Sequence, residues 1–154
     1  MHTGSVGAHA TYFILVGGWR SPGGTFTLTL NGPPAPDDHP DAGAWSNAGS
    51  IPIGPNSGDG SRSGQIEAAG DTDLFRLTAP RSGPITISLD VVAGFDGWLE
   101  IYDAGHNLVG TRRNTGGPGS DETFTFTGAA GQPYFVLVGG WRNPAGAYTL
   151  HVNA

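Results

Sequence analysis

The 154-residue sequence contains no cysteine and no lysine, and it has few charged residues of any kind. Without cysteine there can be no disulfide, no thiolate metal ligand and no cysteine nucleophile. Only 13% of the residues are charged, and the formal net charge is -6. No basic stripe could neutralise phosphates, which argues against binding to nucleic acid or to an anionic membrane surface. No apolar run approaches the ~18 residues of a membrane span, so membrane insertion is not expected.

Long helices are also excluded, because 27 glycines and 12 prolines interrupt every stretch that could hold three helical turns. Hydrophobic residues still make up 37% of the chain and fall in short alternating runs. This pattern predicts an all-β protein. The first residues lack the charged and apolar regions of a signal peptide, so either a leader has been removed or the chain is a piece of something longer.

An internal repeat is the most informative feature of the sequence. Residues 12–32 (YFILVGGWRSPGGTFTLTLNG) align without a gap to residues 134–154 (YFVLVGGWRNPAGAYTLHVNA), with 13 of 21 positions identical. In each copy a continuous apolar run is followed by turn residues and then by an alternating run. Each copy is therefore predicted to be a β-hairpin.

The repeat predicts three segments, because one period of 122 residues spans 33–154. Residues 1–32 are then a partial repeat, either the C-terminal hairpin of a preceding β-sandwich or a hairpin donated to a neighbouring subunit. Residues 33–61 are a Pro/Gly-rich acidic linker in which Ile51 and Ile53 could form a short edge strand. Residues 62–154 form the main body. A duplicated hairpin folded into one larger sandwich is the alternative.

The body reads as about eight short strands separated by turn residues. The expected strands are 64–68, 73–78, 85–91, 98–103, 110–113, 123–127, 134–138 and 147–152. Strands of this length and spacing predict a jelly-roll-like antiparallel β-sandwich. We therefore interpret the chain as a tandem-repeat unit with an extra N-terminal β-hairpin from a preceding repeat.

Several segments of residues 35–154 resemble one protein family. They are Asp37–His39, Ala48, Ile51, Gly54, Ser63–Glu67, Gly70–Leu77, Phe95–Asp96, Leu99–Asp103, Gly105, Tyr134–Val138 and Gly146–Leu150. In this order they resemble the bacterial pre-peptidase C-terminal (PPC) domain, which is related to the collagen-binding domains of collagenases. The resemblance implies a secreted, non-catalytic β-sandwich that is usually attached to extracellular hydrolases and often binds calcium.

The resemblance also implies the calcium ligands. Carried over residue by residue, they are Asp37, Asp38 and Asp41 in the linker, and Asp71 and Asp73 in the Asp-x-Asp loop. Five carboxylates in two short segments would repel one another unless a cation lay among them, and calcium prefers oxygen ligands. The alternative is that these are solvated turn residues, a position that aspartate favours.

Two Trp–Arg pairs stand at equivalent positions of the repeat. Trp19 with Arg20 and Trp141 with Arg142 are candidates for contacts with a neighbouring repeat, a second copy or a glycan. The alternative is that each Trp folds back onto the sandwich, with Arg shielding it.

No catalytic motif is visible, because the histidines are scattered and no HExxH or GxSxG pattern occurs. The protein is therefore not expected to be an enzyme. The first hypothesis is an extracellular structural repeat that assembles end to end into a fibre, adhesin or cell-surface array and is made rigid by calcium. The second is the accessory domain of a secreted hydrolase, which would anchor the enzyme to protein or polysaccharide.

Overall fold

The computed structural model describes residues 25, 27, 36–142 and 145–154. Its contacts divide the chain into residues 1–32 and residues 33–154, and the second unit contains all the elements that follow. The partial repeat predicted over residues 1–32, Trp19 and Arg20 included, lies outside the described residues except for positions 25 and 27. No described residue belongs to a helix of the length and hydrophobicity that a membrane span needs.

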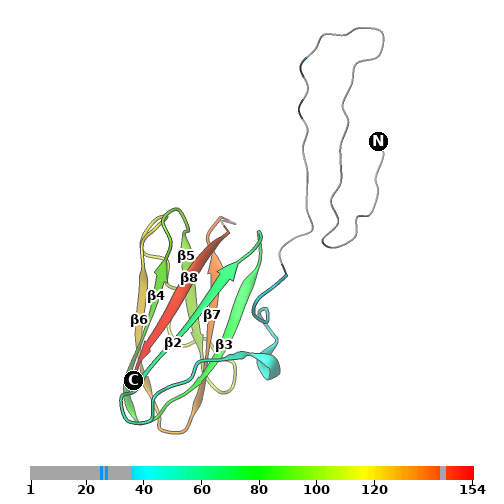
Figure 1. Cartoon of the computed structure of the whole chain (residues 1–154). Helices are drawn as coiled ribbons and strands as arrows, with labels where there is room; N and C mark the ends of the chain where they lie inside the picture. The colour runs from blue at the N-terminus through cyan, green and yellow to red at the C-terminus, as the bar shows by residue number, and fades with distance from the viewer. Residues whose placement is uncertain (1–24, 26, 28–35, 143–144) are drawn as a thin grey trace. The chain divides into compact units, whose positions relative to one another are not determined.

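The described residues of the second unit form a sandwich of two four-stranded sheets (Figure 1). The first sheet has the strand order β1-β3-β7-β5 and the second has the order β2-β8-β4-β6. The elements are η1 (Trp45–Asn47), β1 (Gly49–Ser50), β2 (Asp59–Ile66), β3 (Thr72–Thr78), β4 (Gly83–Val91), β5 (Gly97–Tyr102), β6 (Glu122–Gly128), β7 (Pro133–Gly140) and β8 (Gly146–Asn153). All strand pairs are antiparallel except β1 with β3, so the predicted all-β sandwich is confirmed.

The main core lies between the two sheets and follows from the alternation of apolar residues. Ile85, Ile87 and Leu89 of β4 are buried, whereas the residues between them are more exposed. Phe124 and Phe126 of β6 are buried in the same way. A strand with one wet face shows this period of two, so the sequence pattern alone places these side chains in the core.

The predicted hairpin at residues 134–152 is wrong. β7 pairs with β3 and β5 in the first sheet, whereas β8 pairs with β2 and β4 in the second. The connection after Gly140 therefore crosses from one sheet to the other. The reason is that β7 is buried on both faces, with Val136 and Val138 in the main core and Phe135 and Leu137 in a second apolar cluster, whereas β8 has one exposed face. The two strands therefore suit different sheets.

Three boundaries also differ from the expectation. The edge strand is β1 at Gly49–Ser50 rather than at Ile51 and Ile53. Residues 110–113 form no strand; Arg113 makes only an isolated bridge to Leu99. β2 begins at Asp59, so the sandwich takes in residues that the sequence pattern assigns to a linker.

Residues 37–51, which we call the strap, lie along the open edge of β3. Leu74 N donates a hydrogen bond to the carbonyl of Pro40 at 2.8 Å, and Ile51 N donates to that of Arg76 at 2.9 Å. The strap also carries Trp45 and Ala48 onto the outer face of the first sheet. There they pack, together with Tyr102, against a second apolar cluster, made of Leu74, Trp98, Phe135 and Leu137. The strap therefore covers both an unpaired strand edge and an apolar patch.

Candidate metal centre

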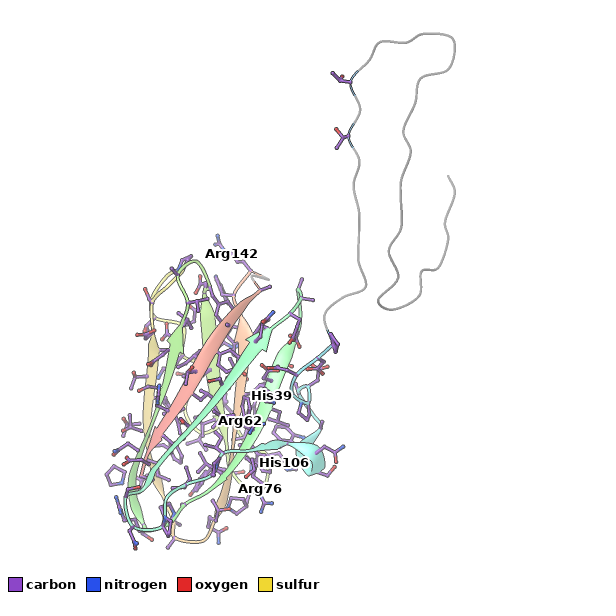
Figure 2. The ribbon with its side chains drawn as sticks, in the orientation of Figure 1. His39, Arg62, Arg76, His106 and Arg142 are labelled. Atoms are coloured by element: carbon purple, nitrogen blue, oxygen red, sulfur yellow. The ribbon has the colours of Figure 1, made fainter. Side chains whose placement is uncertain are left out.

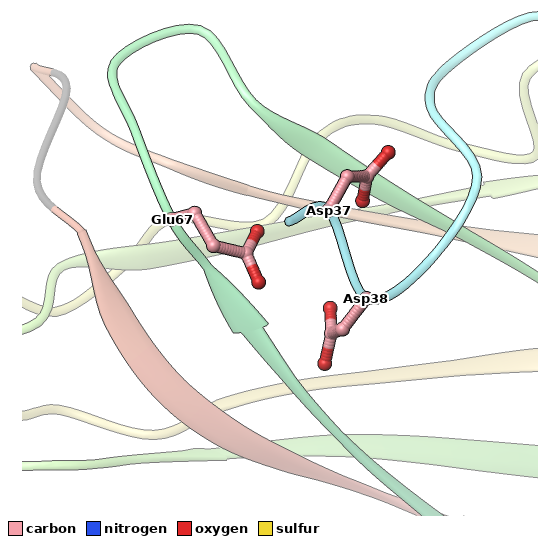
Figure 3. A group of neighbouring side chains, drawn as sticks. All are labelled: Asp37, Asp38 and Glu67. Carbon is pink, nitrogen blue, oxygen red and sulfur yellow. The ribbon is translucent and has the colours of Figure 1, made fainter. Parts of the chain in front are cut away.

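Carboxylates from the strap and from the turn between β2 and β3 meet at one end of the sandwich. One oxygen each of Asp37, Asp38 and Glu67 lie within 4.8 Å of one another (Figure 3). One oxygen from each of Asp37, Asp71 and Asp73 also lies within 4.8 Å of the other two. The two groups share Asp37, so the five side chains form one acidic cluster.

The strap is held beside the cluster by His39, which is buried. Its backbone N–H donates to Asp37 Oδ1 at 3.0 Å, and its ring Nε2 donates to the Ser63 carbonyl at 3.0 Å. The ring also meets Phe75 edge to face, with centroids 4.6 Å apart. Figure 2 labels His39, which belongs to the strap and lies next to the sandwich. Because this ring is fixed in the core, the two aspartates that precede it are fixed near β2 as well.

Two oxygens of the cluster are buried and have no hydrogen-bond partner. Asp73 is fully buried; its Oδ2 accepts a hydrogen bond from the Tyr148 hydroxyl at 2.5 Å, but its Oδ1 has no partner. Glu67 Oε2 is likewise without a partner. A buried polar group without a partner carries a desolvation cost. A cation bound among these oxygens would remove that cost.

The ionisation of the cluster reflects the same burial. Burial raises the pKa of Asp73 to about 8, and the hydrogen bond from Tyr148 opposes this shift only in part. Burial, together with the hydrogen bond to Asp71 and the nearby charges, raises the pKa of Glu67 to about 7. Burial beside Asp73 also raises the pKa of Tyr148. The calcium-free cluster therefore holds protons at neutral pH that a bound cation would displace.

The structure brings together four of the five predicted ligands. Asp41 lies apart from both groups: its Oδ1 accepts hydrogen bonds from Thr72 N at 3.3 Å and from Thr72 Oγ1 at 3.1 Å. Glu67 takes the fifth place in the cluster, and the sequence reasoning did not include it as a ligand. Its position directly after β2 was the available signal, because the turn back to Asp71 starts there.

The donor set suits calcium. All five side chains offer carboxylate oxygens, which calcium prefers, and it takes six to eight oxygen ligands in flexible geometry. Asp37 and Asp38 are exposed, whereas Asp73 is buried, so the cluster has an open side through which an ion could enter. The residues present therefore fit a hard divalent cation, with water completing the coordination.

Other candidates from the sequence take different positions. Trp141 is 43% exposed, and its backbone N–H donates to the Asp96 carbonyl at 2.7 Å. Arg142 follows it with a φ of 55°. Asp103, which is not among these candidates, caps its own turn and accepts hydrogen bonds from the backbone N–H groups of Gly105 and Asn107 at 2.8 and 2.9 Å. These hydrogen bonds lower the pKa of Asp103, and those from Asn107 are the largest cause.

Comparison with known families supports the resemblance predicted from the sequence. Residues 71–140 match the model of the bacterial pre-peptidase C-terminal domain. The family predicted from the sequence is confirmed. The matched PPC segment runs from Asp71 to Gly140 and so contains Asp71 and Asp73, whereas Asp37, Asp38 and Glu67 precede it.

The sandwich is also similar to a solved structure. The crystal structure of Aeromonas hydrophila PliG, a periplasmic lysozyme inhibitor of g-type lysozyme, superposes with a TM-score of 0.50. The match has 15% sequence identity and covers 69% of this chain and 94% of that one. At this identity the likeness concerns the fold alone. A search of curated protein sequences finds no match.

Proposed function

We propose that this protein is a non-catalytic, exported β-sandwich module whose acidic cluster binds calcium and thereby fixes the strap to the sandwich. The observation that carries the proposal is the pair of buried, unpartnered carboxylate oxygens, Asp73 Oδ1 and Glu67 Oε2. They face a group of acidic side chains from a segment some 30 residues away in the chain. Calcium would bridge the two segments and make the chain entering the sandwich rigid.

The test is thermal unfolding of the full chain in EDTA and in millimolar calcium. A ligand at 100 times its dissociation constant stabilises a protein by about 2.7 kcal/mol, which raises the Tm by several degrees. Asp71→Ala and Asp73→Asn should abolish the rise. Asp90→Ala, which removes an exposed aspartate of β4, is the matched control and should keep it. An unchanged Tm for the unaltered protein would contradict the proposal.

As to biological role, we favour a structural repeat that assembles end to end into a fibre, adhesin or surface array. Residues 12–32 repeat a sequence which, at 134–154, supplies a central strand to each sheet. From this repeat we propose that residues 12–32 belong to a second sandwich. The acidic cluster, where the strap begins at Asp37, lies beyond the end of β2. Ala154 N donates a hydrogen bond to the Gly58 carbonyl, beside the start of β2. The chain therefore enters and leaves at opposite ends, which suits head-to-tail repeats.

Trp141 and Arg142 are the residues that we propose for contact with a neighbouring copy. Trp141 is among the few large apolar side chains that are exposed in the described part of the chain, and Val92 in the β4–β5 connection is another, at 49%. The β4–β5 connection, with Val92, and the β7–β8 connection, with Trp141, lie at the same end of the sandwich, because Val92 N donates a hydrogen bond to the Ala147 carbonyl at the start of β8. Light scattering of the full chain should show end-to-end association, and Trp141→Ala should reduce it. A strictly monomeric protein would contradict this role.

The second candidate is an accessory domain of a secreted hydrolase, holding the enzyme to protein or polysaccharide. The match to the pre-peptidase C-terminal family favours it. A hydrolase domain encoded in the same open reading frame would decide for this role, and further sandwich repeats in its place would decide for the array.

A further inference from the structure

The strap places an aromatic shelf on the outside of the first sheet, away from the acidic cluster. Trp45 of η1 is half-buried, and the exposed ring of His106 lies flat against it, with centroids 4.3 Å apart and planes 11° apart. Trp45 meets Phe135 edge to face at 5.3 Å and Tyr102 at 5.2 Å. Two segments some 60 residues apart in the sequence thus build one stack of rings. Of these residues, Figure 2 labels His106.

His106 is held in this position at a conformational cost. Its φ is 62°, in the left-handed region that residues with a Cβ rarely adopt. Asp103 fixes the turn, because its side chain accepts hydrogen bonds from the backbone of Gly105 and Asn107. His106 N also donates to the Asp103 carbonyl at 2.9 Å. Strained residues whose surroundings enforce the strain cluster at ligand sites, which makes an exposed ring in this conformation a candidate binding element.

A hollow of about 420 Å³ lies against the stack. Gly43, Trp45, Ser46 and His106 line it. This volume falls within the range of small-ligand pockets, which combine apolar walls with a few polar groups. Here the imidazole and indole supply the flat wall and Ser46 supplies a hydroxyl group, so the hollow offers one apolar face and a polar rim.

The charges around the hollow decide the class of ligand. None of its lining residues is an arginine, an aspartate or a glutamate. Two guanidiniums of the described residues lie on this face. That of Arg112 is bound to Glu100 Oε1 at 2.8 Å and lies 3.9 Å over the ring of Trp98, and Arg76 of β3, which shares the face with Leu74, does not line the hollow. The Asp103 carboxylate belongs to the same turn as His106 and would repel an anion. A neutral ligand is therefore favoured over a phosphate or an acidic sugar.

We propose that the Trp45–His106 shelf binds a pyranose ring of a neutral polysaccharide, with the sugar stacked on the imidazole and its hydroxyl groups at Ser46. A pyranose combines an apolar C–H face with a polar edge, which matches the wall and rim of the hollow. The proposal rests on the second of the two roles above, that of a polysaccharide anchor, and it names the class of ligand and the site.

Affinity electrophoresis of the full chain through gels containing hydroxyethyl cellulose, glucomannan, xylan or galactan tests it. At least one gel should retard the protein, and polygalacturonate should not. His106→Ala should weaken the retardation at least tenfold, whereas His106→Phe, which keeps a flat ring, should retain it. Thr125→Ala, an exposed substitution on the outer face of the other sheet, is the control and should bind as the unaltered protein does.

Retardation by none of the four neutral polysaccharides would overturn the proposal, as would equal retardation of the His106→Ala variant. The calcium-dependent rise in Tm, measured on the same variants, separates this result from the calcium proposal. A rise in Tm without retardation would support the calcium proposal and contradict the sugar proposal. Retardation without a rise in Tm would support the sugar proposal and contradict the calcium proposal.

Discussion

The outer faces of the two sheets differ in chemistry although both cover the same core. The face of the β1-β3-β7-β5 sheet carries buried apolar side chains, Phe135 and Trp98 among them, and is covered by the strap. The face of the β2-β8-β4-β6 sheet carries pairs of hydroxyl groups, such as Thr86 with Thr125 at 2.9 Å and Ser63 with Thr149 at 3.2 Å. The strap is therefore a part of the fold, because in the described part of the chain only the face that it covers carries an apolar cluster that must be shielded from water.

Truncation of an apolar residue under the strap should have the largest effect. Phe135 is 6% exposed and contacts Trp45 and His106. Phe135→Ala should cost about 3–5 kcal/mol of the free energy of unfolding, because it removes buried apolar surface and leaves a cavity. Urea unfolding measures the loss. A loss below about 1 kcal/mol would show that the strap does not bury this face in solution.

The charged group on the same face should contribute less. Arg112→Ala removes the guanidinium stacked on Trp98 and leaves Glu100, which is 9% exposed, without its ion-pair partner. We expect a loss of about 1–2 kcal/mol, also from urea unfolding. Gln65→Ala, at an exposed position on the outer face of β2 in the other sheet, is the control and should change stability by less than about 0.5 kcal/mol. Equal losses for the two variants would remove the difference between the faces.

A change of pH in EDTA tests the end of the strap that meets the acidic cluster. Burial raises the pKa of Asp73 from 3.8 to about 8, so the folded state binds more protons than the unfolded state between these values. Its contribution to stability is therefore fully present below pH 3.8 and is lost as the pH rises through about 8. The loss is spread over this wide window, so each step in pH has a small effect.

The pH measurement is a series of Tm values between pH 5 and pH 9. Asp73→Asn should flatten the decline, because it removes the titrating group and keeps its size. Asp90→Ala should leave the decline unchanged. A Tm that rises steadily with pH in EDTA would contradict the burial of Asp73.

The smallest effect is expected on the hydroxyl face. Thr125→Ala removes one partner of an exposed hydroxyl pair, and exposed substitutions of this kind change stability by about 0.5 kcal/mol or less. Urea unfolding beside the Phe135→Ala variant gives the comparison directly. A loss above about 2 kcal/mol in the free energy of unfolding would show that the hydroxyl pairs of this sheet stabilise the fold as much as its buried residues do.

Much of the fold could be predicted from the sequence because alternation reports which side of a strand is buried. Ile85, Ile87 and Leu89 show this plainly, and they lie in the core. Alternation does not report which sheet a strand joins. The turn residues after Gly140 are compatible both with a hairpin and with a crossing between sheets, and pairing with the distant strands β2 to β5 decides the matter.

The acidic site could be predicted in part, for a different reason. All five predicted ligands come from the resemblance to a family, and four of them meet in the structure. The fifth, Asp41, accepts hydrogen bonds from Thr72 instead. Glu67 reaches the cluster only because β2 and β3 bring its turn beside the strap, and this juxtaposition is a property of the tertiary structure.

The crossing between β7 and β8 has a consequence for biosynthesis. Both strands occupy interior positions, and their ladder partners were synthesised much earlier. Neither sheet can close until residues 133–153 have left the ribosome, so the nascent chain carries open strand edges for most of its translation. Both sheets therefore form late, and because their ladders join residues far apart in the sequence, this folding is slow.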